Sequence, residues 1–200
     1  MLLYERLKDR RIILASNSPR RRQLLADAGI GFELAQKYEC DEVLPADIAA
    51  GDAASYIAEL KSNAYPWPLT ERDILITADT VVIVGNEILG KPADREDALR
   101  MLGLLSGRTH TVVTGVMFRT PAGSHSFKAE TSVTFRPLSD EELAYYVDNF
   151  RPYDKAGAYG IQEWIGYAAV ERIEGSFYNV MGLPVQRLYT ELEAFIGANR

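Results

Sequence analysis

The 200-residue chain is 47% hydrophobic and 25% charged, with a mean hydropathy of −0.13. This balance predicts a single compact domain over residues 1–200 that buries a core of its own. The net charge of −6 and the pI near 5.1 argue against binding to nucleic acid polymers, because such binding needs an excess of Lys and Arg.

The cysteine content and the amino-terminal residues bear on the location of the protein. Cys40 has no second cysteine with which to form an internal disulfide, and MLLYERLKDRR at the start contains no apolar run long enough for the h-region of a signal peptide. Neither secretion nor membrane insertion is indicated. We therefore expect a cytoplasmic protein that does not bind membranes.

Strands and helices alternate in the first half of the chain. Ser18 followed by Pro19 predicts a helix start, because a hydroxyl can cap the helix and proline needs no N–H partner at the first position. After the apolar run ILIT at 74–77, a break in the strand is predicted at Asp79–Thr80. The predicted elements are a strand at 11–15, a helix from 19 that ends at Gly29, a strand at 31–36, a helix at 52–64, and a strand from 73 that continues into a hairpin turning at 85–86.

The second half adds a hairpin of longer strands and further helices. HTVVTGVMFRT and SFKAETSVTFRPL flank PAGS at 121–124, a turn-rich tetrapeptide, which predicts an antiparallel pair. Ser139 and Glu142 have the spacing of a capping box. The other predicted elements are helices at 94–106, 139–150 and 184–197 and a strand at 167–175. Together the elements indicate an α/β class with a mixed sheet and flanking helices.

The stretch LASNSPRRRQLL, residues 14–25, places Arg20, Arg21 and Arg22 in the first turn of a helix. Free N–H groups already give that end about half a positive charge. Arg20 and Arg21 start the face that packs on the sheet, so they point toward the strand's carboxyl end, where ligands bind in open α/β sheets. Together with the hydroxyls of Ser16 and Ser18 they would hold a phosphate chain, which would remove the repulsion. The alternative, a solvated basic turn, is favoured for Arg22.

Three other charged residues leave two interpretations open. Asp79, at the end of an apolar strand, is either a structural cap for a turn or a carboxylate at the ligand-binding edge, where it would bind metal or activate water. Lys61 and Lys91 would be ordinary surface lysines if their spacing alone is considered.

The segment DKAGAYGIQ, residues 154–162, is too rich in glycine for a plain helix. Its small residues predict a backbone that another part of the molecule or a ligand approaches closely. Gln162 at its end can both donate to and accept from the edge of a nucleobase, and the alternative is an ordinary loop amide.

Six segments, taken together, resemble a known family. They are LASNSPRRRQLL, ITADTVV, LGKP, LSGRTHTVVTGV, DKAGAYGIQ and GSFYNVMGLP, which span residues 14–184. In this order and at these separations they resemble the Maf family of nucleoside triphosphate pyrophosphatases. The resemblance implies a mixed α/β fold with a cleft between two lobes, similar to the inosine triphosphate pyrophosphatases (Maf/Ham1 folds). It also implies cleavage between the α and β phosphates, giving the monophosphate and pyrophosphate, with a divalent metal, Mg²⁺ or Mn²⁺.

The resemblance also assigns roles to individual residues. It implies catalytic roles for Arg20, Arg21, Asp79 and Lys91, with Asp79 as general base or metal organiser. It implies substrate binding by Ser16, Lys61, Thr80 and Gln162, with Gln162 at the base. The metal ligands that it implies are Glu33 and Asp79. A homodimer is implied as well.

The choice of substrate rests on the intact DKAGAYGIQ, which is similar to the subgroup that acts on dTTP and UTP. One alternative is the same chemistry on another base, such as 7-methyl-GTP. Another is a nucleotide-binding regulator of septum formation without turnover, since the family is also linked to arrest of septation. The two carboxylates weigh against a regulator, because a binder of polyanions gains from acids only when a metal joins them.

Overall fold

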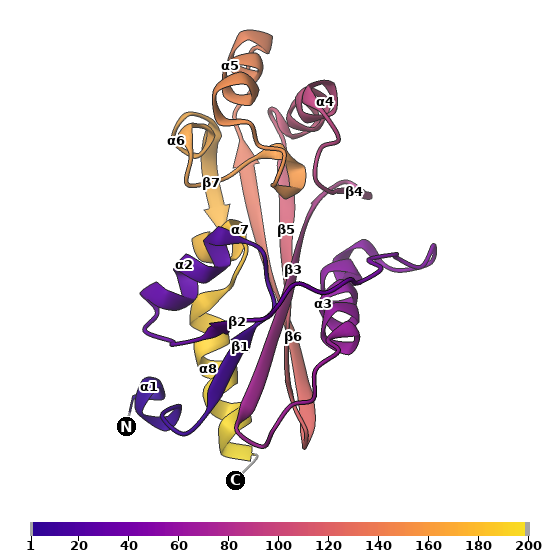
Figure 1. The fold of residues 1–200 in the computed structure, drawn as a ribbon. Coiled ribbons are helices and arrows are strands. Elements are labelled where there is room, and N and C mark those ends of the chain that lie inside the picture. The colour runs from indigo at the N-terminus through magenta and orange to yellow at the C-terminus, as the bar shows by residue number, and fades with distance from the viewer. Residues whose placement is uncertain (1, 199–200) are drawn as a thin grey trace. The chain divides into compact units, whose positions relative to one another are not determined.

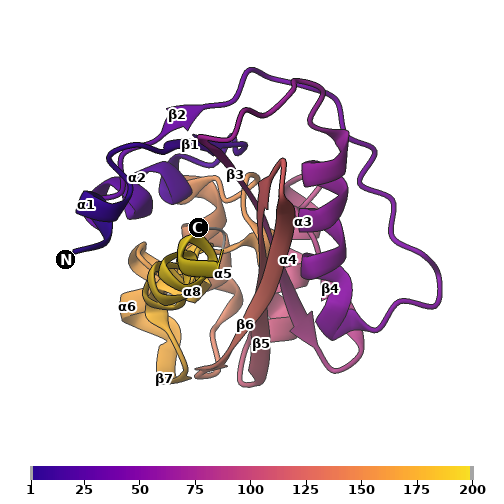
Figure 2. The same cartoon turned by 90° about the horizontal axis from the view of Figure 1, so that it is seen from below.

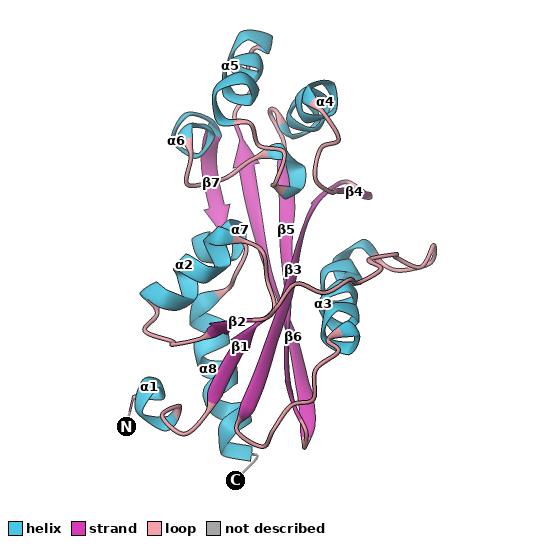
Figure 3. Ribbon diagram, viewed as in Figure 1, coloured by secondary structure: helices cyan, strands magenta, loops and turns pink. Residues whose placement is uncertain are grey.

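The structure, a computed structural model, describes residues 2–198, apart from the side chain of residue 198. Within these residues one seven-stranded mixed sheet has the order β2-β1-β3-β5-β6-β7, and β4 pairs with β3 (Figures 1 and 3). The strands are β1 (Arg11–Leu14), β2 (Glu33–Leu34), β3 (Asp73–Val84), β4 (Glu87–Leu89), β5 (Thr109–Thr120), β6 (Gly123–Phe135) and β7 (Val170–Glu174). The helices are α1 (Leu3–Arg6), α2 (Pro19–Asp27), α3 (Ala53–Ala64), α4 (Arg95–Leu105), α5 (Asp140–Phe150), α6 (Trp164–Ala169), α7 (Phe177–Met181) and α8 (Val185–Ala198), with short 3-10 helices η1 (Ala50–Asp52) and η2 (Ala156–Ala158). The predicted α/β class is confirmed.

The chain divides into two compact units, each built from segments that are far apart in the sequence. Unit 1 comprises Met1–Asp79, Thr114–Ala129 and Gly182–Arg200, and unit 2 comprises Thr80–Val113 and Glu130–Met181. Strands β3, β5 and β6 each contribute residues to both units. The single domain and the cleft between two lobes stay predictions.

Unit 1 combines the parallel strands β1, β2 and the first part of β3 with the end of β5 and the start of β6, and helices cover these strands. β1 pairs in parallel with β2 and with β3, and Leu14 lies opposite Ile76. Helices α2 and α8 cover one face and α3 covers the other, as the two views in Figures 1 and 2 agree. The packing of α3 on β5 is close, because a methyl group on Gly115 would lie 2.5 Å from the Cα of Ser55. β1 and β2 thus end beside the middle of β3, close to Asp79, where the sequence predicts a ligand.

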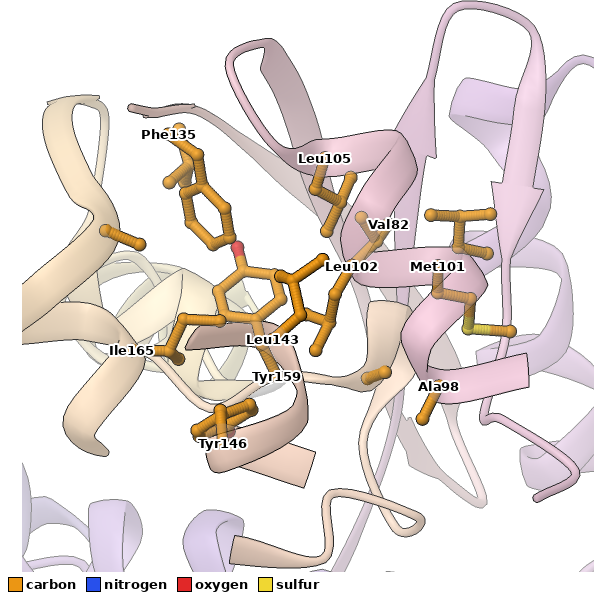
Figure 4. Packing of buried hydrophobic residues seen from close by; sticks show 14 of the residues in the cluster. Val82, Ala98, Met101, Leu102, Leu105, Phe135, Leu143, Tyr146, Tyr159 and Ile165 are labelled. Atoms are coloured by element: carbon orange, nitrogen blue, oxygen red, sulfur yellow. The ribbon is translucent and has the colours of Figure 1, made fainter. Parts of the chain in front are cut away.

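Unit 2 has its own hydrophobic core, to which α4, α5, α6 and the strands all contribute. Figure 4 shows Leu102, Leu143 and Ile165, from these three helices, pointing into the same cluster. Within it, His110 is buried, and its Nε2 lies 2.8 Å from the hydroxyl of Tyr159. Burial lowers the pKa of His110 to about 4, because the apolar surroundings disfavour the charged imidazolium.

Local signals in the sequence predict helix starts well. The Ser18 hydroxyl accepts from the N–H of Arg21 at 3.4 Å. Both hydrogen bonds of the capping box are present: the Ser139 side chain accepts from the N–H of Glu142, and the Glu142 side chain accepts from the N–H of Ser139. Each signal depends on residues within one helical turn, so no distant part of the chain has to be known.

Three sequence predictions are wrong in detail. β3 continues through Asp79–Thr80 without the predicted break, because its extended backbone goes on to pair with β4, where Val82 lies opposite Leu89. β2 is only two residues long, where residues 31–36 were expected as a strand. Residues 167–169, predicted as strand, belong to α6, which buries Ile165 and Ala169 four residues apart on one face.

No described helix combines the length and the apolar character that crossing a membrane requires.

Candidate functional site

The carboxyl end of β1 lies beside the middle of β3, in unit 1. The N–H of Ala15 donates to the carbonyl of Ile76 at 2.9 Å, so Ser16 follows at the level of Ala78, next to Asp79. The carboxyl edge of parallel strands is the usual position for ligands in open α/β sheets. The structure therefore brings Ser16 and Asp79 to a common edge.

Helix α2 points its amino-terminal end at this edge. Its cap, Ser18, donates its own N–H to Ser16 Oγ at 3.2 Å, so the turn between β1 and α2 is held by the two serines. The first turn carries Arg20 and Arg21 and no acidic residue of its own. Backbone N–H groups at such an end favour an anion. The turn thus combines hydroxyls, N–H groups and cations in one place.

Arg21 is a buried cation that holds two backbone segments. Its Nε donates to the carbonyl of Gly182 at 2.7 Å, and Nη1 donates to the carbonyl of Ala78 at 2.8 Å. Burial lowers the pKa of its guanidinium from the ordinary value, while the nearby carboxylate of Asp79 opposes this effect and Arg20 adds to it. Arg21 therefore fixes the backbone just before Asp79 and places a positive charge beside it.

Lys61 joins the group from α3. Its Nζ lies 2.7 Å from Oδ1 of Asp79 and 3.1 Å from Oε2 of Glu42. The carbonyl of Lys61 accepts from the hydroxyl of Tyr38 at 2.7 Å, which ties the end of the helix to the loop that carries Glu42. Both Lys61 and Asp79 are mostly buried, with 17% and 16% of their side chains exposed. Two carboxylates thus converge on one cation.

Glu42 is a site residue that the sequence analysis missed. It lies in the loop that follows β2, and the acidic run ECDE at 39–42 was its only signal. Such a run is ordinarily a solvated loop, so composition alone gives no reason to single out its last residue.

Glu33, the predicted metal ligand, lies elsewhere in unit 1. It is on β2 opposite Ile13, and its exposed carboxylate lies 3.8 Å from Nη1 of Arg11. Ile13 is in turn opposite Leu75, four residues before Asp79, and four strand residues span about 13 Å. The structure does not bring Glu33 to Asp79.

The remaining predicted residues, Thr80, Lys91 and Gln162, belong to unit 2. Lys91 is exposed and follows Gly90, whose carbonyl accepts from the N–H of Gly157 at 3.0 Å. Gly157 has a φ of +67°, and a methyl group on it would lie 2.9 Å from the side chain of Val82. The predicted close approach to the DKAGAYGIQ backbone is confirmed, and what approaches is β3.

Gln162 ends this segment with a buried carbonyl. Its Oε1 has no hydrogen-bond partner among the described residues. A buried acceptor without a partner costs free energy, so this oxygen is an acceptor that a ligand or an ordered water could satisfy.

The donor set of the site suits a hard divalent cation only in part. Among the residues that the structure describes, no three His, Cys, Asp or Glu side chains gather as metal ligands. Asp79 and Glu42 each supply a carboxylate oxygen to the Lys61 ammonium, which stands where a metal cation would. Mg²⁺ often takes one or two carboxylates and completes its coordination with phosphate oxygens and water.

Comparisons with known proteins give consistent results. The profile of the family described as Maf-like protein matches residues 11–195. A protein of Porphyromonas gingivalis named dTTP/UTP pyrophosphatase is 51% identical over 199 residues, covering 98% of this chain and 100% of that one. A protein of the same name from Flavobacterium johnsoniae is 46% identical over 195 residues, with the same coverage.

A solved structure supports the fold. The Staphylococcus aureus Ham1 protein superposes with a TM-score of 0.52 at 17% identity, covering 93% of this chain and 100% of that one. The predicted likeness to a Ham1 fold is confirmed, and the likeness concerns the fold alone.

Proposed function

Because the chain belongs to the Maf-like family, we propose that it is a nucleoside triphosphate pyrophosphatase that hydrolyses dTTP and UTP to the monophosphate and pyrophosphate. The names of its relatives support this substrate choice. The observation that carries the proposal is the group in unit 1 in which the carboxylates of Asp79 and Glu42 share the ammonium of Lys61. Acids and cations in contact at a sheet edge suit a phosphate chain better than a neutral ligand.

The phosphate chain binds at the amino-terminal end of α2 in this proposal. Backbone N–H groups, the Ser16 hydroxyl and the guanidinium of Arg20 contact phosphate oxygens, as anions at helix ends commonly are held. Arg21 contributes positive charge, while two of its N–H groups keep the Ala78 and Gly182 carbonyls in place. Lys61 and Lys91 neutralise the charge that builds up on the leaving pyrophosphate.

Asp79 is the residue that we assign to the attacking water. Its carboxylate orients the water toward the α-phosphorus and accepts the proton, while the bond between the α-phosphorus and the bridging oxygen breaks. This chemistry depends on positioning and charge, which agrees with a site made of cations and carboxylates. Thr80, the next residue, contacts the substrate in the same proposal.

Asp79 and Glu42 are the residues that would hold a divalent cation, Mg²⁺ or Mn²⁺. Such a cation, when bound, neutralises phosphate charge and lowers the pKa of a water ligand. We place the second carboxylate at Glu42 instead of Glu33, because Glu42 shares a partner with Asp79 and Glu33 is paired with Arg11. Lys61 would then turn from the carboxylates to the phosphates.

Gln162 is proposed to contact the base. The support is the buried Oε1 without a partner among the described residues, which a donor on a pyrimidine would satisfy. We further propose a cytoplasmic homodimer, because free nucleoside triphosphates are its substrates and the family resemblance implies a dimer. Light scattering of the purified protein would give the mass of the assembly.

The experiment is a measurement of pyrophosphate release from dTTP, UTP, CTP, GTP, ATP and 7-methyl-GTP, each with Mg²⁺ or Mn²⁺. We expect turnover of dTTP and UTP, and a loss of about a hundredfold or more in kcat for Asp79→Asn. Asp47→Asn, which removes an exposed carboxylate in the same unit, should keep the activity of the unaltered protein.

Other outcomes would contradict separate parts of the proposal. Turnover of 7-methyl-GTP alone would retain the reaction and refute the assignment of the base. Binding of nucleotides without any turnover would refute the enzyme and favour a regulator.

A further inference from the structure

A buried polar network surrounds Gly160 in unit 2. Tyr146 donates its hydroxyl proton to Oε2 of Glu163 and accepts the N–H of Gly160 at 3.0 Å. The ammonium of Lys155 lies 3.1 Å from Oε1 of Glu163 and 2.7 Å from Asp154. Both oxygens of the Glu163 carboxylate are therefore held, one by a phenol and one by an ammonium.

The partners of Glu163 are themselves fixed. Tyr146 is fully buried, and its ring stacks on Phe150 with centroids 5.1 Å apart. Burial and the bond to Glu163 raise the pKa of Tyr146 above its ordinary value, so the phenol keeps its proton and donates it. Lys155 is 7% exposed. Because buried polar groups are costly when unpaired, this network resists movement of the carboxylate.

Gln162 lies against the same network. A methyl group on Gly160 would lie 3.0 Å from three atoms, namely Gln162 Nε2, Glu163 Cδ and Lys155 Cε. Gln162 Nε2 and the carboxyl carbon of Glu163 therefore both lie next to Gly160, while Oε1 of Gln162 is buried without a partner among the described residues.

The charge of Glu163 decides which way this amide faces. An amide can turn over and exchange its NH₂ and carbonyl ends with little change in shape, and its surroundings select the orientation. A carboxylate attracts the partly positive NH₂ end and repels the carbonyl oxygen. The Glu163 carboxylate, in its pair with Lys155, thus favours the orientation in which NH₂ is toward Glu163 and Oε1 is left as an acceptor for a ligand.

An acceptor in a fixed position distinguishes pyrimidines. Uracil and thymine carry a donor at N3, between two carbonyl oxygens, whereas cytosine carries an acceptor at N3 beside an amino donor. A fixed acceptor pairs with the N3–H of uracil or thymine and repels N3 of cytosine. An amide that is able to rotate by half a turn would pair with uracil or thymine and also with cytosine. Discrimination therefore requires a group that prevents this rotation.

We propose that Glu163, held by Tyr146 and Lys155, is a positioning residue that fixes the Gln162 amide as an acceptor and so selects uracil and thymine nucleotides over cytosine nucleotides. This inference rests on the proposed function, in which Gln162 contacts the base. Glu163 does not touch the substrate in this account, and it acts through Gln162.

Titration calorimetry tests the proposed role of Glu163 without catalytic turnover, by measuring the binding of UTP and CTP analogues that carry a methylene bridge between the α and β phosphates. We expect the unaltered protein to bind the UTP analogue more tightly. In Glu163→Gln, which keeps the size of the side chain and removes its charge, the ratio of the two dissociation constants should fall by about tenfold or more. Glu174→Gln, the same change at an exposed site of β7, should leave the ratio unchanged.

Melting temperatures of all variants accompany the titrations. If Glu163→Gln does not fold, Tyr146→Phe replaces it, because that change keeps the ring and frees one carboxylate oxygen; the ratio should again fall. An unchanged ratio in the folded variant, with discrimination intact, would overturn the role of Glu163 and leave the proposed function standing. An unaltered protein that binds neither analogue would overturn both.

Discussion

The stability of the protein should fall in mild acid because of His110. Burial lowers the pKa of His110 to about 4, against an ordinary value of 6.5. Below pH 6.5 the unfolded chain takes up a proton that the folded protein does not bind, so folding loses free energy until the pH reaches about 4. The full contribution is present above pH 6.5, and the slope in this range approaches about 1.4 kcal/mol per pH unit.

The size of the effect can be measured with a variant that does not titrate. From the two pKa values, the free energy of unfolding should fall by about 2.5 kcal/mol more in the unaltered protein than in His110→Gln between pH 7.5 and pH 4.5. Urea unfolding at a series of pH values gives both curves. Glutamine is chosen because it retains a group that can bond to the Tyr159 hydroxyl.

The ring signals of His110 in NMR spectra provide an independent check, since their titration midpoint should lie near pH 4. Parallel stability curves for the two proteins, or a midpoint near 6.5, would refute the reasoning. Carboxylates begin to titrate near pH 4.5, but they are the same in both proteins, so the difference between the two curves reports His110.

Two further predictions concern packing and the phosphate site. Gly115→Ala should lower the free energy of unfolding by about 3 kcal/mol in urea titrations, because its methyl group would lie 2.5 Å from backbone atoms of Ser55. The control is Gly103→Ala, at a position of α4 where a methyl group meets open space; this change should raise the free energy of unfolding by about 1 kcal/mol. Equal effects of the two changes would contradict the packing argument. Lys61→Met should lower kcat/KM for UTP by about a hundredfold, because the ammonium that neutralises the charge on the leaving pyrophosphate is lost. Lys37→Met, at an exposed lysine of the same unit, serves as the control, and similar losses in both variants would refute a specific role for Lys61.

The sequence predicts those parts of the site that depend on neighbours along the chain. The Ser18 cap and the cationic first turn of α2 follow from one heptapeptide, and Asp79 follows from the end of an apolar run. These features need only helix and strand periodicity to be recognised.

The partners of these residues could not be predicted in the same way. Arg21 bonds to carbonyls 57 and 161 residues away, so its structural role depends on how the whole unit packs. Glu42 reaches Lys61 from an irregular loop, where no periodicity marks one acid among several. Glu33 was predicted as a metal ligand from the family resemblance, and the order of residues along β2 does not reveal that its register places Glu33 opposite Ile13, away from Asp79.

The bond that breaks is the central claim, and hydrolysis of UTP in water enriched in ¹⁸O tests it most directly. ³¹P NMR and mass spectrometry of the products would locate the label. The account predicts one ¹⁸O atom in UMP and none in pyrophosphate, because water attacks the α-phosphorus. Label in pyrophosphate, or release of orthophosphate in place of pyrophosphate, would contradict it.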